Sequence, residues 1–172
     1  MELAFYLSGL VAVLATLGVI TGRNPVHAVV YLIVSLIAVA MVFFALGAPF
    51  AGALEIIVYA GAIMVLFVFV VMMLNIGPEQ DGDHTGWRHP RLWIGPSVLA
   101  AVLLAVMITL LVRGDMAGAI DGELLAARSV GLTLFGPWLV VVELAALLLL
   151  GALISASHVG RRSNPLRNRS GR

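Results

Sequence analysis

The sequence predicts an all-α integral membrane protein, a bundle of five transmembrane helices with a periplasmic N-terminus and a cytoplasmic C-terminus. Its 172 residues are 62% hydrophobic and only 11% charged, and the mean hydropathy is +1.10. A soluble domain has roughly 45–50% apolar and about 25% charged residues, so this composition excludes one. Five apolar runs, each long enough to cross a hydrocarbon core of about 30 Å, point to the same fold class.

The first three predicted spans follow one another closely. Asn24 is a good N-cap and Pro25 is well placed at the first helical position, so a second helix is expected to begin there. A polar loop of three acids, two histidines and two arginines separates the third span from the fourth. Residues 1–160 are predicted to form one membrane domain, and residues 161–172 an Arg-rich cytoplasmic tail. The five spans cover about residues 3–20, 26–46, 50–75, 92–112 and 137–157.

The last apolar run is too long for one straight span. A single helix from Val130 to His158 would be about 43 Å long, which exceeds the hydrocarbon core. We therefore expect Gly136 and Pro137 to interrupt it, so that the fifth span begins near Pro137.

The arginines orient the bundle. All ten basic residues are arginine, and with five spans only Arg113 and Arg128 would lie on one side of the membrane. Because cytoplasmic loops carry the excess of basic residues, the opposite side is predicted to be cytoplasmic. The N-terminal residues have neither a basic region nor a cleavage site, so they are predicted to form a retained span. The arginines on the cytoplasmic side are Arg23, Arg88, Arg91, Arg161, Arg162, Arg167, Arg169 and Arg172.

Several kinds of chemistry have no support in the sequence. The chain has no cysteine, which excludes disulfides, thiolate metal sites and cysteine-bound iron–sulfur clusters. His84 and His89 in the polar loop are a weak metal signal, while His27 and His158 are interpreted as interfacial anchors. We find no phosphate-binding glycine motif, no nucleophile–base pair and no dinucleotide fold. No catalytic, metal, cofactor or nucleic-acid site is predicted.

The third span carries the most informative polar residues. Glu55, Tyr59 and Gly61 lie within seven positions of an otherwise apolar run. At helical spacing, Glu55 and Tyr59 share one face with three other residues. Two interpretations stay open: close helix packing through small residues, or a polar seam that holds or gates water. Gly61 lies off this face but weakens the helix where a π-bulge or kink could form. The predicted face consists of Gly52, Glu55, Tyr59, Ala62 and Leu66.

Two carboxyl groups lie inside predicted spans, where an isolated charge is expensive. Glu55 is about five residues into its span, roughly 7–8 Å from the outer end, so it is either an interfacial acid or a member of the polar seam. Glu143 follows Pro137 by six positions in a strongly apolar run and is expected to lie deeper. An inward-facing protonatable role and a polar contact with a partner helix are both open for Glu143.

The sequence resembles subunit J of bacterial NADH:quinone oxidoreductase (respiratory complex I), the family of mitochondrial NADH dehydrogenase chain 6. The resemblance covers roughly residues 1–160, and its most distinctive segment is GALEIIVYAGAIMVLFVF at residues 52–69. RNPVHA at residues 23–28, WIGP at residues 93–96 and LTLFGP at residues 132–137 extend it.

The resemblance implies a five-helix subunit of the membrane arm, near its junction with the quinone-binding arm. It implies a π-bulge around Tyr59 to Val65, whose conversion to regular helix opens or closes a water wire between the quinone cavity and the antiporter-like subunits. Tyr59, Gly61 and Val65 thus become the main gating candidates. Most relay carboxylates and lysines of the family lie in neighbouring subunits, which leaves Glu55 and Glu143 as auxiliary or structural candidates.

The resemblance also implies partners and location. NADH, FMN, iron–sulfur clusters and quinone are expected in other subunits, and this chain is a non-catalytic subunit of a proton-translocating oxidoreductase. Its partners would be other membrane-arm subunits and the lipid of the bacterial inner membrane. Two alternatives remain. The first is the equivalent subunit of a membrane-bound hydrogenase or other-donor oxidoreductase. The second is a stand-alone transporter or channel, which the lack of an internal repeat disfavours.

Overall fold

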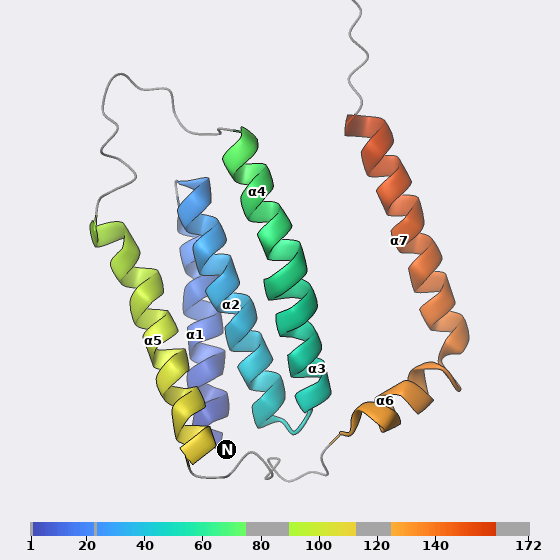
Figure 1. The fold of residues 1–172 in the computed structure, drawn as a ribbon, viewed down its shortest axis with the longest axis horizontal. Coiled ribbons are helices and arrows are strands. Elements are labelled where there is room, and N and C mark those ends of the chain that lie inside the picture. Colours follow the sequence, from blue (N-terminus) through green and yellow to red (C-terminus); the bar gives the residue numbers. More distant parts are fainter. Residues whose placement is uncertain (1, 23, 75–89, 113–124, 161–172) are drawn as a thin grey trace, which may run out of the picture. The chain divides into compact units, whose positions relative to one another are not determined.

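The computed structural model describes residues 2–22, 24–74, 90–112 and 125–160. Five helical segments are long and apolar enough to cross a membrane, which confirms the predicted all-α class and the number of spans. The predicted loop histidines His84 and His89 and the tail at 161–172 lie outside the described residues. In chain order (Figure 1) the elements are α1 (Glu2–Thr21), α2 (Pro25–Ala45), α3 (Pro49–Leu54), η1 (Glu55–Ile63), α4 (Met64–Leu74), α5 (Pro90–Val112), α6 (Ala127–Leu134) and α7 (Leu139–Gly160).

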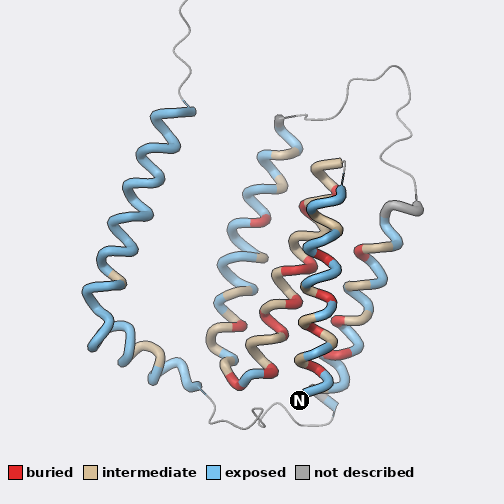
Figure 2. Tube along the Cα trace, turned by 180° about the vertical axis from the view of Figure 1, so that it is seen from behind, coloured by how far each residue is buried: buried red, intermediate tan, exposed pale blue. Residues whose placement is uncertain are grey.

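The chain divides into two compact units, residues 1–126 and residues 127–172. In the first unit α2 is central, because it contacts α1, α5 and all three parts of the third span, α3, η1 and α4. Figure 2 shows that buried residues concentrate on the faces where these helices meet.

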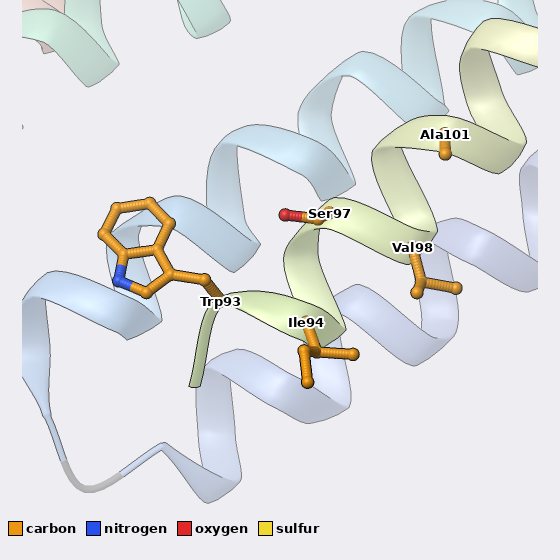
Figure 3. A pocket seen from close by; sticks show the side chains of 5 residues that line it. All are labelled: Trp93, Ile94, Ser97, Val98 and Ala101. Atoms are coloured by element: carbon orange, nitrogen blue, oxygen red, sulfur yellow. The ribbon is translucent and has the colours of Figure 1, made fainter. Parts of the chain in front are cut away.

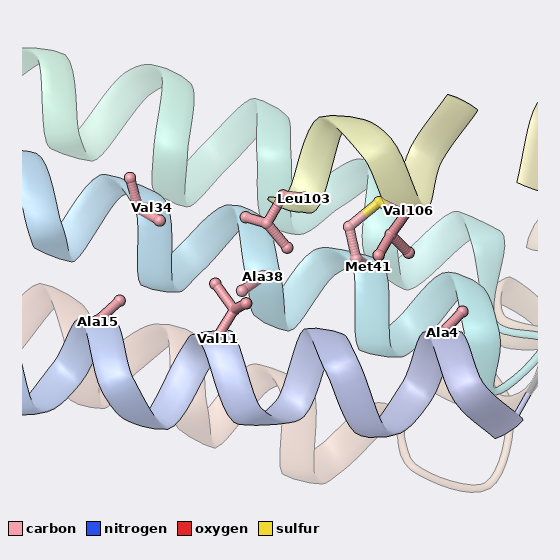
Figure 4. Close-up of a cluster of buried hydrophobic side chains, with 8 residues drawn as sticks. All are labelled: Ala4, Val11, Ala15, Val34, Ala38, Met41, Leu103 and Val106. Carbon is pink, nitrogen blue, oxygen red and sulfur yellow. The ribbon is translucent and has the colours of Figure 1, made fainter. Parts of the chain in front are cut away.

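The core of the first unit lies between α1, α2 and α5 (Figure 4). Small side chains dominate the α1–α2 contact, and Ala15 and Ala38 are fully buried. In a bilayer the packing of small residues replaces the hydrophobic effect as the force that joins helices. The cluster consists of Ala4, Val11, Ala15, Val34, Ala38, Met41, Leu103 and Val106.

Hydroxyl groups add polar links between α1 and α2. The hydroxyls of Thr16 and Ser35 lie 2.9 Å apart, and both donate to the Ala12 carbonyl, at 2.8 and 3.2 Å. Such an interhelical bond contributes on average about 0.6 kcal/mol, and up to about 2 kcal/mol. This contact was not predicted from the sequence, although serine and threonine inside apolar spans are its signal.

Local sequence sets both ends of α2. The Asn24 side-chain oxygen accepts a hydrogen bond from the Val26 N–H at 3.0 Å, and Pro25 occupies the first turn, as expected. At the other end Gly47 adopts a φ of 79°, a conformation that a residue with a Cβ rarely tolerates. Its carbonyl accepts from the Leu125 N–H at 2.9 Å. The tight turn leads directly into α3.

Gly52 sets the distance between α3 and α2. A Cβ at this position would lie 2.9 Å from the Ala40 carbonyl oxygen and 3.1 Å from the Phe44 ring. Only a residue without a side chain permits this approach, so the start of the third span is fixed against α2.

The second unit contains α6, a turn at residues 135–138 and α7. The interruption predicted at Gly136 and Pro137 lies in this turn, and α7 then runs for 22 residues. None of the α7 residues is buried.

Gly52→Val is expected to lower the stability of the protein. The new side chain collides with the Ala40 backbone, which cannot rotate away, and overpacking of this kind costs about 1–3 kcal/mol. The measurement is the thermal unfolding midpoint of the detergent-solubilised protein. Gly9→Val is the control, because a Cβ at Gly9 meets nothing within 4 Å. Equal midpoints for the two variants would contradict the close approach of α3 to α2.

Candidate functional site

The third span changes its winding at Glu55. The Glu55 N–H still bonds to the Ala51 and Gly52 carbonyls, four and three positions earlier, as α-helices do at their ends. From Glu55 to Ile63 the backbone is π-helical, and the Met64 N–H reaches back to the Tyr59 carbonyl, five positions earlier. A nine-residue π segment is longer than the usual single-turn bulge, and such bulges occur frequently at functional sites.

The π segment begins earlier than the resemblance implies. The expected position was around Tyr59 to Val65, whereas the segment covers Glu55–Ile63 and returns to α-helix at Met64. Tyr59 and Gly61 therefore lie inside it, and Val65 lies in α4, just beyond it.

Gly61 is suited to this backbone. A Cβ on Gly61 would lie 3.1 Å from the Ile56 carbonyl oxygen, five positions earlier. That is closer than nine in ten Cβ contacts in proteins, and the crowded oxygen belongs to the backbone of the wide turn itself. The glycine thus permits the π winding, in agreement with the predicted weak point of the helix.

The extra residue per turn changes which side chains face α2. In the third span Gly52 is buried, and from Glu55 onward the buried and half-buried positions step by five, four, four and three. The step of five falls inside η1, between Glu55 and Ala60, and Met64 beyond it is only 8% exposed. We call these positions the α2-facing ridge: Gly52, Glu55, Ala60, Met64, Val68 and Val71.

The predicted polar face is therefore wrong beyond Glu55. It assumed α-helical spacing through Tyr59 to Leu66, but Tyr59 is 50% exposed and Leu66 is 66% exposed. The one-residue insertion of the π turn rotates both away from the ridge. Ala60 and Met64 face α2 instead. Counting from Glu55 at 3.6 residues per turn does not predict these two positions.

The five candidate residues fall into two groups. Glu55, Tyr59, Gly61 and Val65 lie along one segment of the third span, where Glu55 is half-buried and Val65 is 52% exposed. Glu143 lies in α7 of the second unit and is exposed.

The helix bounds give the position of each acid along its own helix. Glu143 is four positions past the start of α7, about 6 Å along the axis, and Glu55 is six positions past the start of α3, about 9 Å. The expectation that Glu143 lies deeper in the membrane stays a prediction.

His27 and Trp93 meet near the start of α2 and of α5. Their rings pack edge to face with centroids 5.6 Å apart, and His27 is buried. Trp93 also begins an open groove on α5 (Figure 3), lined by Trp93, Ile94, Ser97, Val98 and Ala101. One hydroxyl and one indole are too few polar groups to orient a ligand. Elsewhere in the described part of the chain, no three His, Asp or Glu residues cluster as a metal site would require.

Comparison with known proteins agrees with the helical pattern. Residues 15–159 match the family model of NADH-ubiquinone/plastoquinone oxidoreductase chain 6. The chain is 59% identical to NADH-quinone oxidoreductase subunit J of Pseudomonas aeruginosa over 162 residues, which are 94% of this chain and 98% of the relative. It is 58% identical to the Escherichia coli K12 subunit J, covering 94% and 87% of the two chains. The Buchnera aphidicola (Acyrthosiphon pisum) subunit J is 47% identical over 98% of this chain and 99% of its own length.

Gly61→Ala is expected to shift η1 toward α-helix. Alanine favours α-helix over glycine by about 0.8–1.0 kcal/mol, and its Cβ crowds the Ile56 carbonyl of the wide turn. A change of this size alters a two-state ratio about fivefold. In an electron cryo-microscopy structure, the Met64 N–H would pair with the Ala60 carbonyl rather than with that of Tyr59.

The control for this change is Gly151→Ala in α7, where a Cβ meets nothing within 4 Å. That variant should leave η1 as it is. An unchanged π segment in Gly61→Ala would show that Gly61 does not determine the winding.

Proposed function

Since the chain belongs to the NADH-ubiquinone/plastoquinone oxidoreductase chain 6 family, we propose that it is a membrane subunit whose third span gates proton movement in such an enzyme. Its relatives are subunit J of NADH-quinone oxidoreductase, and the chain is a multi-pass membrane protein with five apolar spans. The observation that carries the gating role is the five-residue step of the α2-facing ridge across η1.

The gate is a change of winding. If η1 became α-helical while α3 stayed fixed on α2 through Gly52, every position beyond Glu55 would turn by one residue, or about 100°. The ridge of Ala60, Met64, Val68 and Val71 would then be replaced by Tyr59, Ile63, Phe67 and Val70. Both ridges are mostly apolar, so each gives a packed contact with α2. Two such discrete packings are what a switch requires.

The change also moves a polar pair. Residues four apart lie on one face of an α-helix, so the α form would bring the Tyr59 phenol to the same side as the Glu55 carboxyl. In the π form Glu55 is half-buried while Tyr59 is turned outward. Two polar groups side by side in a dry contact can hold water between them, whereas the separated groups leave an apolar seam. We assign the conducting state to the α form.

The low cost of the change follows from the backbone. In lipid every N–H must keep an internal partner, and both windings satisfy this, with a carbonyl five or four positions earlier. Conversion therefore exchanges hydrogen bonds one at a time and exposes none to hydrocarbon. Met64, at the centre of the moving ridge, has an unbranched side chain that adapts to irregular space.

The location, orientation and partners of the chain are part of the same proposal. The chain lies in the bacterial inner membrane with its N-terminus periplasmic and its C-terminal tail cytoplasmic, as the arginine distribution favours. Residues 1–160 act as one membrane domain that packs among other membrane-arm subunits. The lack of cysteine leaves the chain no thiolate for an iron–sulfur cluster. We assign NADH, FMN, the clusters and quinone to other subunits, as the membership of the family implies.

Gly61→Val should leave the enzyme assembled but slow its coupled turnover. The branched side chain crowds the Ile56 carbonyl in the π form. It therefore disfavours the π state, one of the two states of η1. A penalty of about 1 kcal/mol corresponds to about fivefold slower quinone reduction with proton pumping. Membrane vesicles of the assembled enzyme provide both rates. Unchanged coupled activity with normal assembly would remove Gly61 from the mechanism.

The carboxyl variants Glu55→Gln and Glu143→Gln should have smaller effects than Gly61→Val. A carboxamide keeps the shape and hydrogen-bonding capacity of the side chain, and neither acid is proposed as an obligatory proton carrier. The same vesicle assay compares all three variants. Complete loss of pumping in either carboxyl variant would make that acid a relay group and overturn the auxiliary role.

A further inference from the structure

The second helix packs against different neighbours on two opposite sides. Ala38 belongs to the core cluster that α2 shares with α1 and α5, whereas the Ala40 carbonyl lies against Gly52 of the third span. At about 100° per residue, Tyr31 lies about 20° from Ala38 and about 180° from Ala40. Tyr31 is therefore on the side of α2 that faces α1 and α5, away from the third span.

The Tyr31 ring occupies the space that two glycines leave open. A Cβ on Gly18 of α1 would lie 2.8 Å from the Cδ1 atom and 2.9 Å from the Cε1 atom of the ring. A Cβ on Gly95 of α5 would overlap the Tyr31 hydroxyl. Neither glycine can therefore carry a side chain while the ring stays in place. We call Gly18, Tyr31 and Gly95 the tyrosine slot.

The slot meets α5 where that helix lacks a hydrogen bond. Pro96, the next residue after Gly95, lies inside α5 and has no N–H for the preceding turn, so a helix bends readily at this point. His27, four positions before Tyr31 and on the same face of α2, packs edge to face on Trp93 with ring centroids 5.6 Å apart. Two ring-bearing side chains of α2 thus hold the first turns of α5.

The slot lies at the depth of the middle of the α2-facing ridge. Gly52 approaches α2 near Ala40 and Phe44, and the tight turn between the two helices makes them antiparallel (Figure 1). Met64 is twelve positions beyond Gly52, about 17 Å along the span when the inserted residue is subtracted. Along α2, Tyr31 lies about 14 Å before Ala40 and about 20 Å before Phe44. The slot therefore supports α2 on the side opposite to the buried Met64.

We propose that Tyr31 is a positioning residue for the gate, because its place between Gly18 and Gly95 prevents α2 from turning with the third span. The α1–α2 contact otherwise consists mainly of small side chains such as Ala15 and Ala38, which resist rotation little. Turning α2 would drive the Tyr31 ring into the backbone of α1 or of α5. A change of winding in η1 then rotates α4 and is not absorbed by α2. This inference rests on the proposed function, whereas the slot itself does not depend on the winding of η1.

The geometry of the slot is tested by a rescue experiment in the assembled enzyme. Gly95→Ala places a methyl group on the Tyr31 hydroxyl and should lower the temperature at which the enzyme dissociates. Tyr31→Phe removes that hydroxyl, so the double variant should regain most of the lost stability. The ring carbon Cζ, 3.0 Å from the new methyl group, needs only a small shift.

Gly18→Ala is the matched control for this rescue, because its methyl group meets ring carbons that phenylalanine retains. Tyr31→Phe should therefore not restore the stability of Gly18→Ala. Gly9→Ala, where a Cβ meets nothing within 4 Å, should behave as the native protein. Equal rescue of both slot glycines, or rescue of neither, would contradict the slot.

The positioning role is tested with a disulfide that takes over the function of the slot. Tyr31→Leu removes the ring and should reduce the number of protons pumped per quinone reduced, at equal amounts of assembled enzyme. The hydroxyl oxygens of Thr16 and Ser35 lie 2.9 Å apart, so cysteines at these positions are placed to form an S–S bond of about 2 Å between α1 and α2. The chain has no cysteine of its own. Oxidation of the triple variant should restore pumping, and reduction with dithiothreitol should abolish it again.

The crosslink in the presence of the native tyrosine provides a second measurement. Thr16→Cys/Ser35→Cys with Tyr31 intact should pump normally when oxidised, because α1 and α2 keep their places in both states of the gate. Native enzyme treated with the same oxidant controls for damage to other subunits. Lost pumping in this crosslinked variant, normal pumping in Tyr31→Leu, or a disulfide that fails to restore it would each overturn the proposal. Unchanged pumping in Gly61→Val, with Gly95→Ala still rescued by Tyr31→Phe, would instead reject the gate and leave the slot in place.

Discussion

The obligation to pair every backbone N–H inside lipid governs how this chain can move. An open loop or a broken strand at this depth would leave groups without partners, at a cost of several kcal/mol each. A π segment is one of the few irregularities that avoids this cost, because it changes the partner and keeps the bond. In the third span the Met64 N–H is bonded five positions back instead of four. The helix beyond η1 is therefore rotated without any loss of hydrogen bonding. In this way the local winding of the backbone decides which side chains of the rest of the span pack against α2.

The anchor for that rotation lies in the close contact of α3 with α2. Gly52 lies so near the Ala40 carbonyl that the start of the third span cannot rotate freely, and the tight turn at Gly47 shortens the connection to α2. The two glycines of the third span therefore have opposite roles. Gly52 fixes the helix at one end by close packing, whereas Gly61 leaves the carbonyl of Ile56 room to occupy the wide turn. Under the proposed gating, a helix held at one end and able to rewind in its middle would convert a change of winding into a turn of its far end.

Composition and helix-breaking residues were sufficient to predict most of the architecture. The register that decides which side chains of the third span face α2 was not predictable. Five apolar runs, the cap at Asn24 and the interruption at Gly136 and Pro137 depend on local chemistry, and the structure agrees with each. The α2-facing ridge depends on the number of residues per turn, which varies within a single span. Tyr59 and Leu66 were assigned to the Glu55 face at 3.6 residues per turn, and the inserted residue moved both outward. Gly61 was the one local sign of that irregularity, and it indicates where the winding can change rather than which state the helix adopts.

The two acids of the apolar spans differ in their surroundings within their own units. Glu55 lies at the first position of η1, half-buried on the ridge that faces α2, so its neighbours change with the winding. Glu143 lies in a regular α-helix, α7, with no buried residue. Under the proposed gating, therefore, Glu55 changes its neighbours with the winding of η1, whereas the regular winding of α7 gives Glu143 no such change.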